Sequence, residues 1–375
     1  MMFLLKKIFI NASVLLLLLS CVGTKEQFPP VCGEVVHMRH SSLLSIVECD
    51  GYTVVDIADP WSNRTMQRYL LVPSAVELPK GLPAGIVLRT PLDDVILFSG
   101  VHANLLCELG VEQTIKGICD AQYMYCDAIA DDLMSGAVAN CGSSLNVDTE
   151  AVMQVTPDAI FVLPYENGGF GKLDNLGFPL VLCADYMESS PLGCAEWMRF
   201  YGRLFGLDAK CDSLFSLVCS DYESMNGAVQ AVSYRPKLMC ELKSTSAWYV
   251  PCNESTMGRL YADAGADYLF SWCKGSGSVP LSYEVVLDKA ADADVWLFKY
   301  NSDVDRTYSS LSADFVGYSH FKPFRQRRIY ACNTRYRHLF EETAFHPERL
   351  LKELIAIFHP DVIPDYTLCY YEKMY

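Results

Sequence analysis

From residue 92 onward, short continuous apolar runs alternate with segments whose apolar residues follow a helical period. Continuous apolar runs are typical of strands buried on both faces, as in parallel sheets that helices cover. The alternation therefore predicts an α/β fold. The expected strands are residues 95–98, 115–119, 159–163, 180–182, 237–242, 295–300 and 328–331, and the expected helices are residues 103–109, 257–264, 284–290 and 347–358.

A helical stretch lies between two α/β halves of similar length. Ser190 can cap a helix whose first position is Pro191, and Gly206 can end it in a left-handed conformation. Apolar residues recur there at helical spacing, at Ala195, Met198, Tyr201 and Phe205. A second helical stretch covers about residues 210–232. Residues 188–233 are therefore predicted to form a stiff helical bridge.

The two halves share a short unit. Residues 150–158 and 284–292 both begin with Glu, end with Asp and lead into an expected strand. Glu150 and Glu284 each fall in the first turn of a short helix, behind the possible caps Asp148 and Ser282. The repeat predicts a duplicated fold of two lobes, residues 92–187 and 234–375. Each lobe would present one exposed carboxylate to a basic partner.

The segment before the first lobe has a different pattern. Short strand-like runs at residues 35–36, 46–47, 54–57 and 69–72 alternate with polar turns, which predicts a β meander over residues 31–91.

The first 21 residues resemble a lipoprotein signal peptide. Lys6 and Lys7 precede a mostly apolar run over residues 8–19, which is short for a membrane span. The run ends in Leu-Leu-Ser-Cys, so Cys21 is the expected lipidated N-terminus. Loss of two lysines would move the net charge from −15 to −17.

Composition narrows the function. A chain of 375 residues that is 51% hydrophobic can fill two domain-sized cores. A net charge of −15 argues against nucleic acid as a partner. Enzyme motifs such as Gly-x-Ser-x-Gly, a Walker loop or Gly-x-Gly-x-x-Gly after a strand are absent from the sequence. The sixteen cysteines are scattered, which favours small buried residues over a disulfide framework.

These features together resemble the substrate-binding lipoproteins of ABC importers, in the helix-linked branch that binds cobalamin, ferric siderophores and haem. Residues 146–163 and 283–298 resemble that family's two docking regions, and residues 164–167, 186–198 and 263–268 resemble motifs of Bacteroides-like members. The resemblance covers about residues 92–366. It implies two Rossmann-like lobes joined by a long helix (a class III periplasmic binding protein), a monomer in the periplasm, a lipid anchor and no catalysis. It also implies that Glu150 and Glu284 meet arginines of a permease dimer, which works with an ATPase.

Ligands of open α/β sheets bind beyond the carboxyl ends of the strands, which selects loops in both lobes. Aromatic residues there can stack on a flat ligand, and Arg335 can meet an anionic group. The candidate ligand-binding residues are His102, Tyr125, Tyr165, Glu166 and Asn167 in the first lobe, and Trp248, Tyr249, Asn301, Asn333 and Arg335 in the second. The expected cargo is a metal chelate, with no intrinsic cofactor.

Other functions stay open at this stage. The histidines show no ligand spacing typical of a metal site, so no metal ligand is assigned, yet direct binding of Zn, Mn or Fe is an alternative. His102 or a loop tyrosine is a candidate axial ligand of haem. A surface lipoprotein without a permease, or an enzyme on a similar scaffold, is a further alternative.

Overall fold

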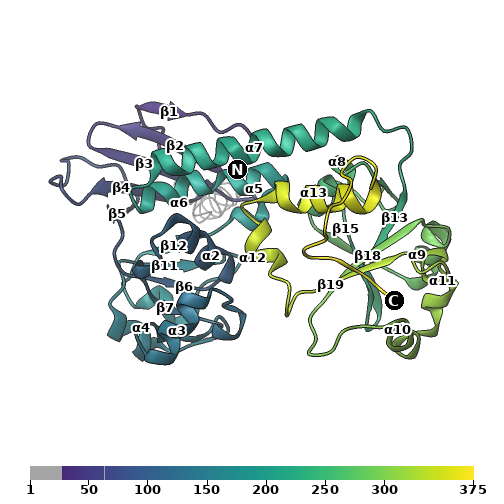
Figure 1. Ribbon diagram of the computed structural model, residues 1–375. Helices are drawn as coiled ribbons and strands as arrows, with labels where there is room; N and C mark the ends of the chain where they lie inside the picture. The colour runs from purple at the N-terminus through teal and green to yellow at the C-terminus, as the bar shows by residue number, and fades with distance from the viewer. Residues whose placement is uncertain (1–27, 63) are drawn as a thin grey trace, which may run out of the picture. The chain divides into compact units, whose positions relative to one another are not determined.

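The apolar runs become the central strands of two five-stranded sheets, one in each lobe (Figure 1). The computed structural model describes residues 28–62 and 64–375. The expected signal peptide and Cys21 lie outside the described residues. Cys32–Tyr375 form a single unit. Among the residues described, no helix has both the length and the apolar character needed to cross a membrane.

The sheet of the first lobe is entirely parallel, as its apolar strands predict. Its strand order is β12-β11-β6-β7-β8, and the residues of β6 are fully buried. The strands are β6 (Val95–Leu97), β7 (Ile115–Ile118), β8 (Ala139–Asn140), β11 (Ala159–Val162) and β12 (Leu180–Leu182), and the helices are α2 (Gly100–Leu109), α3 (Asp127–Ser135) and α4 (Thr149–Val155).

The sheet of the second lobe has the order β16-β13-β18-β19-β20, and only β20 is antiparallel. A smaller antiparallel sheet, β14-β15-β17, belongs to the same lobe. The strands are β13 (Lys237–Cys240), β14 (Lys243–Ser244), β15 (Ala247–Pro251), β16 (Asp267–Tyr268), β17 (Ser278–Leu281), β18 (Val295–Tyr300), β19 (Ile329–Asn333) and β20 (Glu372–Lys373). The helices of the lobe are α8 (Thr256–Asp263), α9 (Tyr283–Ala290), α10 (Tyr308–Asp314) and α11 (Lys322–Arg325).

The predicted helical bridge consists of α5 (Pro191–Glu196), α6 (Met198–Leu204) and α7 (Asp208–Gln230). Ser190 caps α5 by accepting a hydrogen bond from the Gly193 N–H, and Pro191 occupies the first turn. Gly206 has a φ of 67°, so it allows the turn between α6 and α7. The expected single helix is divided at Trp197, whose ring is fully buried.

The N-terminal segment forms a β sheet, as predicted, but it has five strands, in the order β1-β2-β3-β4-β5, where four were expected. Its last strand was not expected, and it pairs parallel with β4. Tyr69 joins this sheet to the first lobe, because its hydroxyl donates to the Leu180 carbonyl and accepts from the Leu182 N–H, both at 2.8 Å. The strands are β1 (Glu34–Val36), β2 (Leu44–Cys49), β3 (Tyr52–Ala58), β4 (Thr65–Pro73) and β5 (Ile86–Thr90).

Two buried carboxylates at the start of the bridge hold the loop that precedes β2. Glu188 accepts backbone N–H groups of Ser42 and Leu43, each at 3.0 Å, and the Trp197 Nε1–H. Glu196 accepts the N–H groups of residues 39–41 at 2.8–3.0 Å. Neither glutamate was assigned a role from the sequence, because a buried glutamate cannot be distinguished there from an exposed one.

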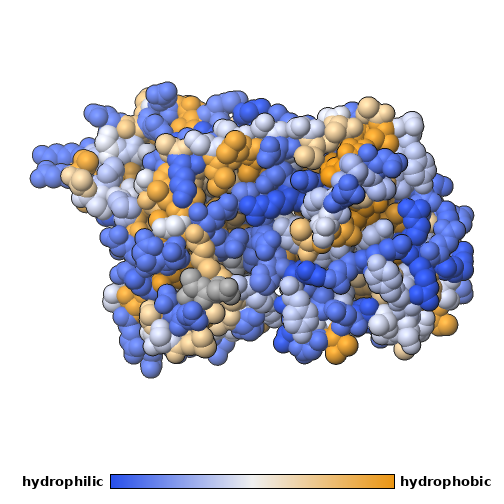
Figure 2. Space-filling view, in the orientation of Figure 1, coloured by the Kyte–Doolittle hydropathy of each residue, from blue (hydrophilic) through white to orange (hydrophobic). Residues whose placement is uncertain are grey.

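The chain returns from the second lobe to the first before it ends. Helix α12 (Leu339–Thr343) contacts α2 of the first lobe, and α13 (Pro347–Phe358) contacts α7, α8 and α5 (Figure 1, yellow). The predicted boundaries of α13 are confirmed. Figure 2 shows that hydrophilic residues cover most of this face of the molecule, in keeping with its net charge of −15.

Candidate functional site: a cavity at the strand ends of the first lobe

The order of the first sheet reverses between β6 and β11, since β6 is followed by β7 on one side and β11 lies on the other. Loops diverge at such a point and leave a crevice beyond the carboxyl ends of the strands. A cavity of about 1070 Å³ lies there. Phe98 and His102, which follow β6, and Leu163 and Tyr165, which follow β11, line it.

The wall of this cavity is mainly apolar and comes from three parts of the fold. The bridge contributes Pro191 and Cys194, and the second lobe contributes helices α8, α12 and α13 rather than loops. The apolar lining includes Val101, Leu145, Val147, Val162, Phe170, Leu173, Met257, Leu260, Leu339, Phe340, Ala344, Pro347 and Leu350. A large apolar cavity with few polar groups is typical of a small-molecule binding site.

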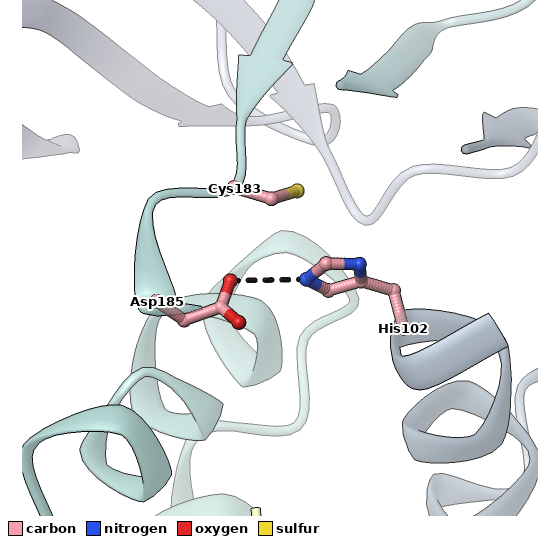
Figure 3. A group of neighbouring side chains, drawn as sticks. All are labelled: His102, Cys183 and Asp185. Carbon is pink, nitrogen blue, oxygen red and sulfur yellow. Dashed lines mark hydrogen bonds and ion pairs between the residues drawn. The ribbon is translucent and has the colours of Figure 1, made fainter. Parts of the chain in front are cut away.

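Two of the polar residues in the wall, His102 and Asp185, face each other (Figure 3). His102 Nε2 lies 3.0 Å from Asp185 Oδ1, and the Tyr201 hydroxyl donates to the same oxygen at 2.6 Å. His102 and Asp185 are almost completely buried. Burial by itself lowers the pKa of His102, but Cys183 and Asp185 beside it raise that pKa well above its ordinary value.

The pKa of the Asp185 carboxyl shifts in the opposite direction to that of His102. Burial alone would raise its pKa, but His102 and the Tyr201 hydroxyl keep it below the ordinary value. A buried charge is tolerated only when it is paired and hydrogen-bonded, and the histidine and tyrosine meet that condition here. Asp185 and Tyr201 were not among the predicted site residues, although both lie in or next to the helical stretch on which the bridge prediction rested.

Of the predicted ligand-binding residues, His102 and Tyr165 line the cavity. Tyr165 is 58% exposed, and its hydroxyl donates to the Gly169 carbonyl at 2.9 Å. Glu166 and Asn167 are exposed beside it and do not line the cavity. Tyr125 also lies outside the lining, and its ring stacks on His338 with 4.4 Å between the ring centroids. That stack joins the two lobes.

The expectation that Trp248 faces a ligand is wrong, because its side chain is fully buried in the second lobe. Its Nε1–H donates to the Cys240 carbonyl at 2.9 Å, and its ring packs against Trp296 and Tyr318. Successive residues of a strand point to opposite faces. Trp248 therefore points into the core, while its neighbour Tyr249 is 52% exposed.

Asn333 is also buried away from the cavity. Its amide donates to the Ser302 carbonyl at 2.9 Å and to Asp305 at 3.0 Å, so it fixes the loop after β18. The expectation that it faces a ligand is corrected by these contacts.

The remaining second-lobe candidates do not line the cavity either. Asn301 and Tyr249 are exposed, and Arg335 pairs with Asp303 at 2.6 Å. The order of the second sheet reverses between β13 and β18. At the ends of these strands Lys299 forms an ion pair with Glu241.

The two candidate docking glutamates are both exposed in the first turn of a helix. The expected caps are present: Asp148 accepts the Glu150 N–H at 3.0 Å, and Ser282 accepts the Val285 N–H at 3.4 Å. A hydrogen bond with its own backbone N–H and one with Ser282 lower the pKa of Glu284. Both carboxylates are exposed to solvent at the N-terminal end of a helix.

All fifteen cysteines of the described residues are free, and ten of them are buried. The closest pair is Cys107 and Cys126, whose Sγ atoms lie 2.6 Å apart. Burial raises the pKa of most of the buried thiols, for example that of Cys141 to about 11, so they are held as thiols in the core.

Several known proteins are similar to this chain in sequence or in structure. A lipoprotein of Methanocaldococcus jannaschii, named as uncharacterized, is 26% identical over 286 residues, which cover 73% of this chain and 67% of the relative. This relative is archaeal, so a link to Bacteroides-like bacteria stays a prediction.

Solved structures share the fold at low sequence identity. A periplasmic heme-binding protein from Roseiflexus sp. RS-1 matches with a TM-score of 0.57 and 17% identity over 72% of this chain and 99% of its own. An ABC-type Fe³⁺-hydroxamate transport protein from Saccharomonospora viridis matches with a TM-score of 0.56 and 17% identity over 74% of this chain and 97% of its own. The family and these neighbours are substrate-binding proteins, not enzymes. The model of one family, described as periplasmic binding protein, matches residues 95–336, and the chain therefore belongs to the periplasmic binding protein family.

Proposed function

We propose that this protein is the extracytoplasmic substrate-binding component of an ABC importer. It holds a metal chelate, of the ferric siderophore, haem or cobalamin type, in the cavity beyond β6 and β11. It passes the chelate to a permease dimer that works with an ATPase. A lipid on Cys21 anchors the monomer to the cell envelope, and no nucleic acid takes part.

The observation that carries this proposal is the size and polarity of the cavity. Its volume of about 1070 Å³ lies at the upper end of the roughly 300–1,000 Å³ typical of small-molecule sites. A single ion or an amino acid would leave most of that space unfilled, whereas a macrocycle or chelate fills it. The mainly apolar wall, with Phe170 and Phe340 among its residues, suits the hydrocarbon surface of such a ligand. Relatives of the same fold are named for heme and for Fe³⁺-hydroxamate.

Delivery would use the two exposed glutamates. Glu150 on α4 and Glu284 on α9 each stand at the N-terminal end of a helix, one in each lobe. A permease dimer has two-fold symmetry, so one arginine from each subunit can pair with one glutamate from each lobe. Such pairs at a rim set orientation and the rate of association more than affinity.

The test is a titration of the protein without residues 1–21 with haem, cobalamin and ferric siderophores of the catecholate and hydroxamate types. Calorimetry and the absorbance of the chelate are the readouts, because the residues that line the cavity include no tryptophan. Saturable binding of one chelate class at one equivalent supports the proposal. If none of the chelates binds, the cavity serves another ligand and the proposal fails.

A pair of matched variants locates the bound chelate. Phe340→Glu places a charge in the apolar wall, and we expect it to weaken binding by at least about 10-fold, since a single buried methylene group alone contributes about 0.8 kcal/mol. Leu217→Glu is the control, because Leu217 is 64% exposed on α7 and lies outside the lining. Equal affinities for these two variants would place the ligand elsewhere.

A further inference from the structure

Three side chains with different donor atoms meet beside the cavity (Figure 3). A ring nitrogen of His102, the sulfur of Cys183 and a carboxylate oxygen of Asp185 all lie within 4.8 Å of one another. Within the residues that the structure describes, this is the single group of three or more His, Cys, Asp or Glu side chains with that property.

The fold places these three donors with little freedom to move. The Cys183 N–H donates to the Val162 carbonyl at 2.8 Å, which continues the pairing of β12 with β11. Asp185 follows two residues later at the start of a short turn, Asp185–Met187. His102 lies in the first turn of α2, behind the cap Ser99. The end of β12 and the start of α2 therefore converge on one point, and all three side chains are buried.

We propose that His102, Cys183 and Asp185 bind a divalent transition-metal ion of the zinc type. Imidazole nitrogen, thiolate sulfur and carboxylate oxygen are the three donors that Zn²⁺ takes in proteins, with bonds of about 2.0–2.3 Å. Donors around a tetrahedral ion with such bonds lie about 3.3–3.7 Å apart. The 3.0 Å between His102 Nε2 and Asp185 Oδ1 is close to that spacing, so small side-chain movements admit the ion.

A tetrahedral ion held by these three residues has a fourth coordination position, which faces either the cavity or Tyr201. His102 and Asp185 are part of the cavity wall, whereas Cys183 lies behind them and does not line it. The Tyr201 oxygen is 3.2 Å from His102 Nε2 and 2.6 Å from Asp185 Oδ1, so it is a neighbour of the ion or a fourth ligand. The ion enters from the cavity, and the His102 ring and the Cys183 thiol each release a proton to the solvent when they bind it. This inference stands apart from chelate transport.

The experiment uses Co²⁺ as a spectroscopic probe for Zn²⁺ on chelator-treated protein without residues 1–21. We expect one equivalent of Co²⁺ to give a thiolate-to-cobalt charge-transfer band together with the visible bands of a four-coordinate site, and Zn²⁺ to displace it. Binding without a thiolate band, or no binding, would show that the three residues form only a hydrogen-bonded group, and the proposal would be overturned.

Two variants test whether Cys183 supplies the sulfur ligand. Cys183→Ser should remove the charge-transfer band and weaken Zn²⁺ binding by at least about 100-fold, because even outer-shell changes at metal sites cost 10- to 100-fold. Cys194→Ser is the matched control, since Cys194 is a buried cysteine in the same cavity wall outside the cluster. Similar Zn²⁺ affinities of the two serine variants would refute the site.

X-ray absorption on the zinc-loaded native protein gives a second test that does not depend on any variant folding. One sulfur and two or three nitrogen or oxygen neighbours are expected, and a shell without sulfur would contradict the proposal. Chelate titration of Cys183→Ser separates this site from transport, because Cys183 does not contact the cavity and chelate affinity should be retained.

Discussion

At the scale of single residues, several acidic side chains serve as acceptors for backbone N–H groups. Glu188 and Glu196 bind the loop at residues 39–43, and Glu353 accepts the N–H groups of Cys369 and Tyr370 at 2.7 and 2.8 Å. A carboxylate has only acceptors, so it suits a place where several donors converge. These glutamates attach residues 39–43 and 369–370 to the helices, and their role is structural.

Glu188→Gln should lower the free energy of unfolding by about 2–4 kcal/mol. The glutamine NH₂ group would face donors such as the Leu43 N–H and the Trp197 Nε1–H, and a buried donor would lose its acceptor. Urea unfolding followed by circular dichroism measures the loss. Glu223→Gln is the control, because the Glu223 pair with Arg39 is exposed and should contribute less than about 0.5–1 kcal/mol. Equal effects of both changes would contradict the assigned role.

At the scale of elements, α12 and the start of α13 connect the second lobe to α2. The Asn104 amide donates to the Glu341 carbonyl at 3.0 Å, and His346 contacts Glu108 of α2 at 2.8 Å and Glu348 of α13 at 2.9 Å. Burial alone would lower the pKa of His346, but its bonds with Glu108 and Glu348 raise it to about 9. The histidine is therefore charged in the folded protein at neutral pH.

The raised pKa of His346 predicts how stability depends on pH. Its stabilising contribution is complete below the ordinary value of 6.5 and is lost as pH rises from 6.5 through about 9. Glu108 faces His346. Burial alone would raise the pKa of Glu108, but His346, Arg349 and Lys210 lower it below its ordinary value. Glu108 therefore stays charged throughout that range. We expect a loss of about 2–3 kcal/mol over this range.

The measurement is the free energy of unfolding of ligand-free protein at several pH values between 6 and 9.5. His346→Gln should flatten the slope, because the residue no longer titrates. His37→Gln, at an exposed position, should leave the slope as it is. An unchanged slope in His346→Gln would assign the pH dependence to another group.

At the scale of the whole molecule, a bridge made of α5, α6 and α7 links the two lobes. Helices resist bending, so we expect the lobes to close by a modest amount when a ligand binds. In the proposed function, transfer to a permease would then depend on surface recognition more than on a large change of conformation.

The double variant Glu150→Ala/Glu284→Ala tests that recognition. Both side chains are exposed, so ligand affinity and thermal stability should stay unchanged while uptake by cells falls to background. The double variant Glu77→Ala/Glu254→Ala removes the same charge from other exposed positions and should keep uptake. Normal uptake by the first variant would reject docking through these glutamates.

Sequence by itself determined the local elements. It predicted seven strands of the two lobes, β6, β7, β11, β12, β13, β18 and β19, and missed the others. These seven strands, the caps Ser190, Asp148 and Ser282, and the bounds of α13 depend on residues a few positions apart, which hydrophobic period and capping chemistry record directly. The family also follows from such local motifs, which is why the fold was predictable.

Only the tertiary structure decided which side chains share the cavity. Period-two alternation shows that Trp248 and Tyr249 point to opposite faces, but not which of the two faces the core. His102 meets Cys183 and Asp185 across more than 80 residues of sequence, because the end of β12 and the start of α2 converge beyond the sheet. Helices α12 and α13 line the cavity in place of the expected loops, because the chain returns from the second lobe to contact α2 and the bridge. Such contacts depend on how elements pack, and no short stretch of sequence encodes that.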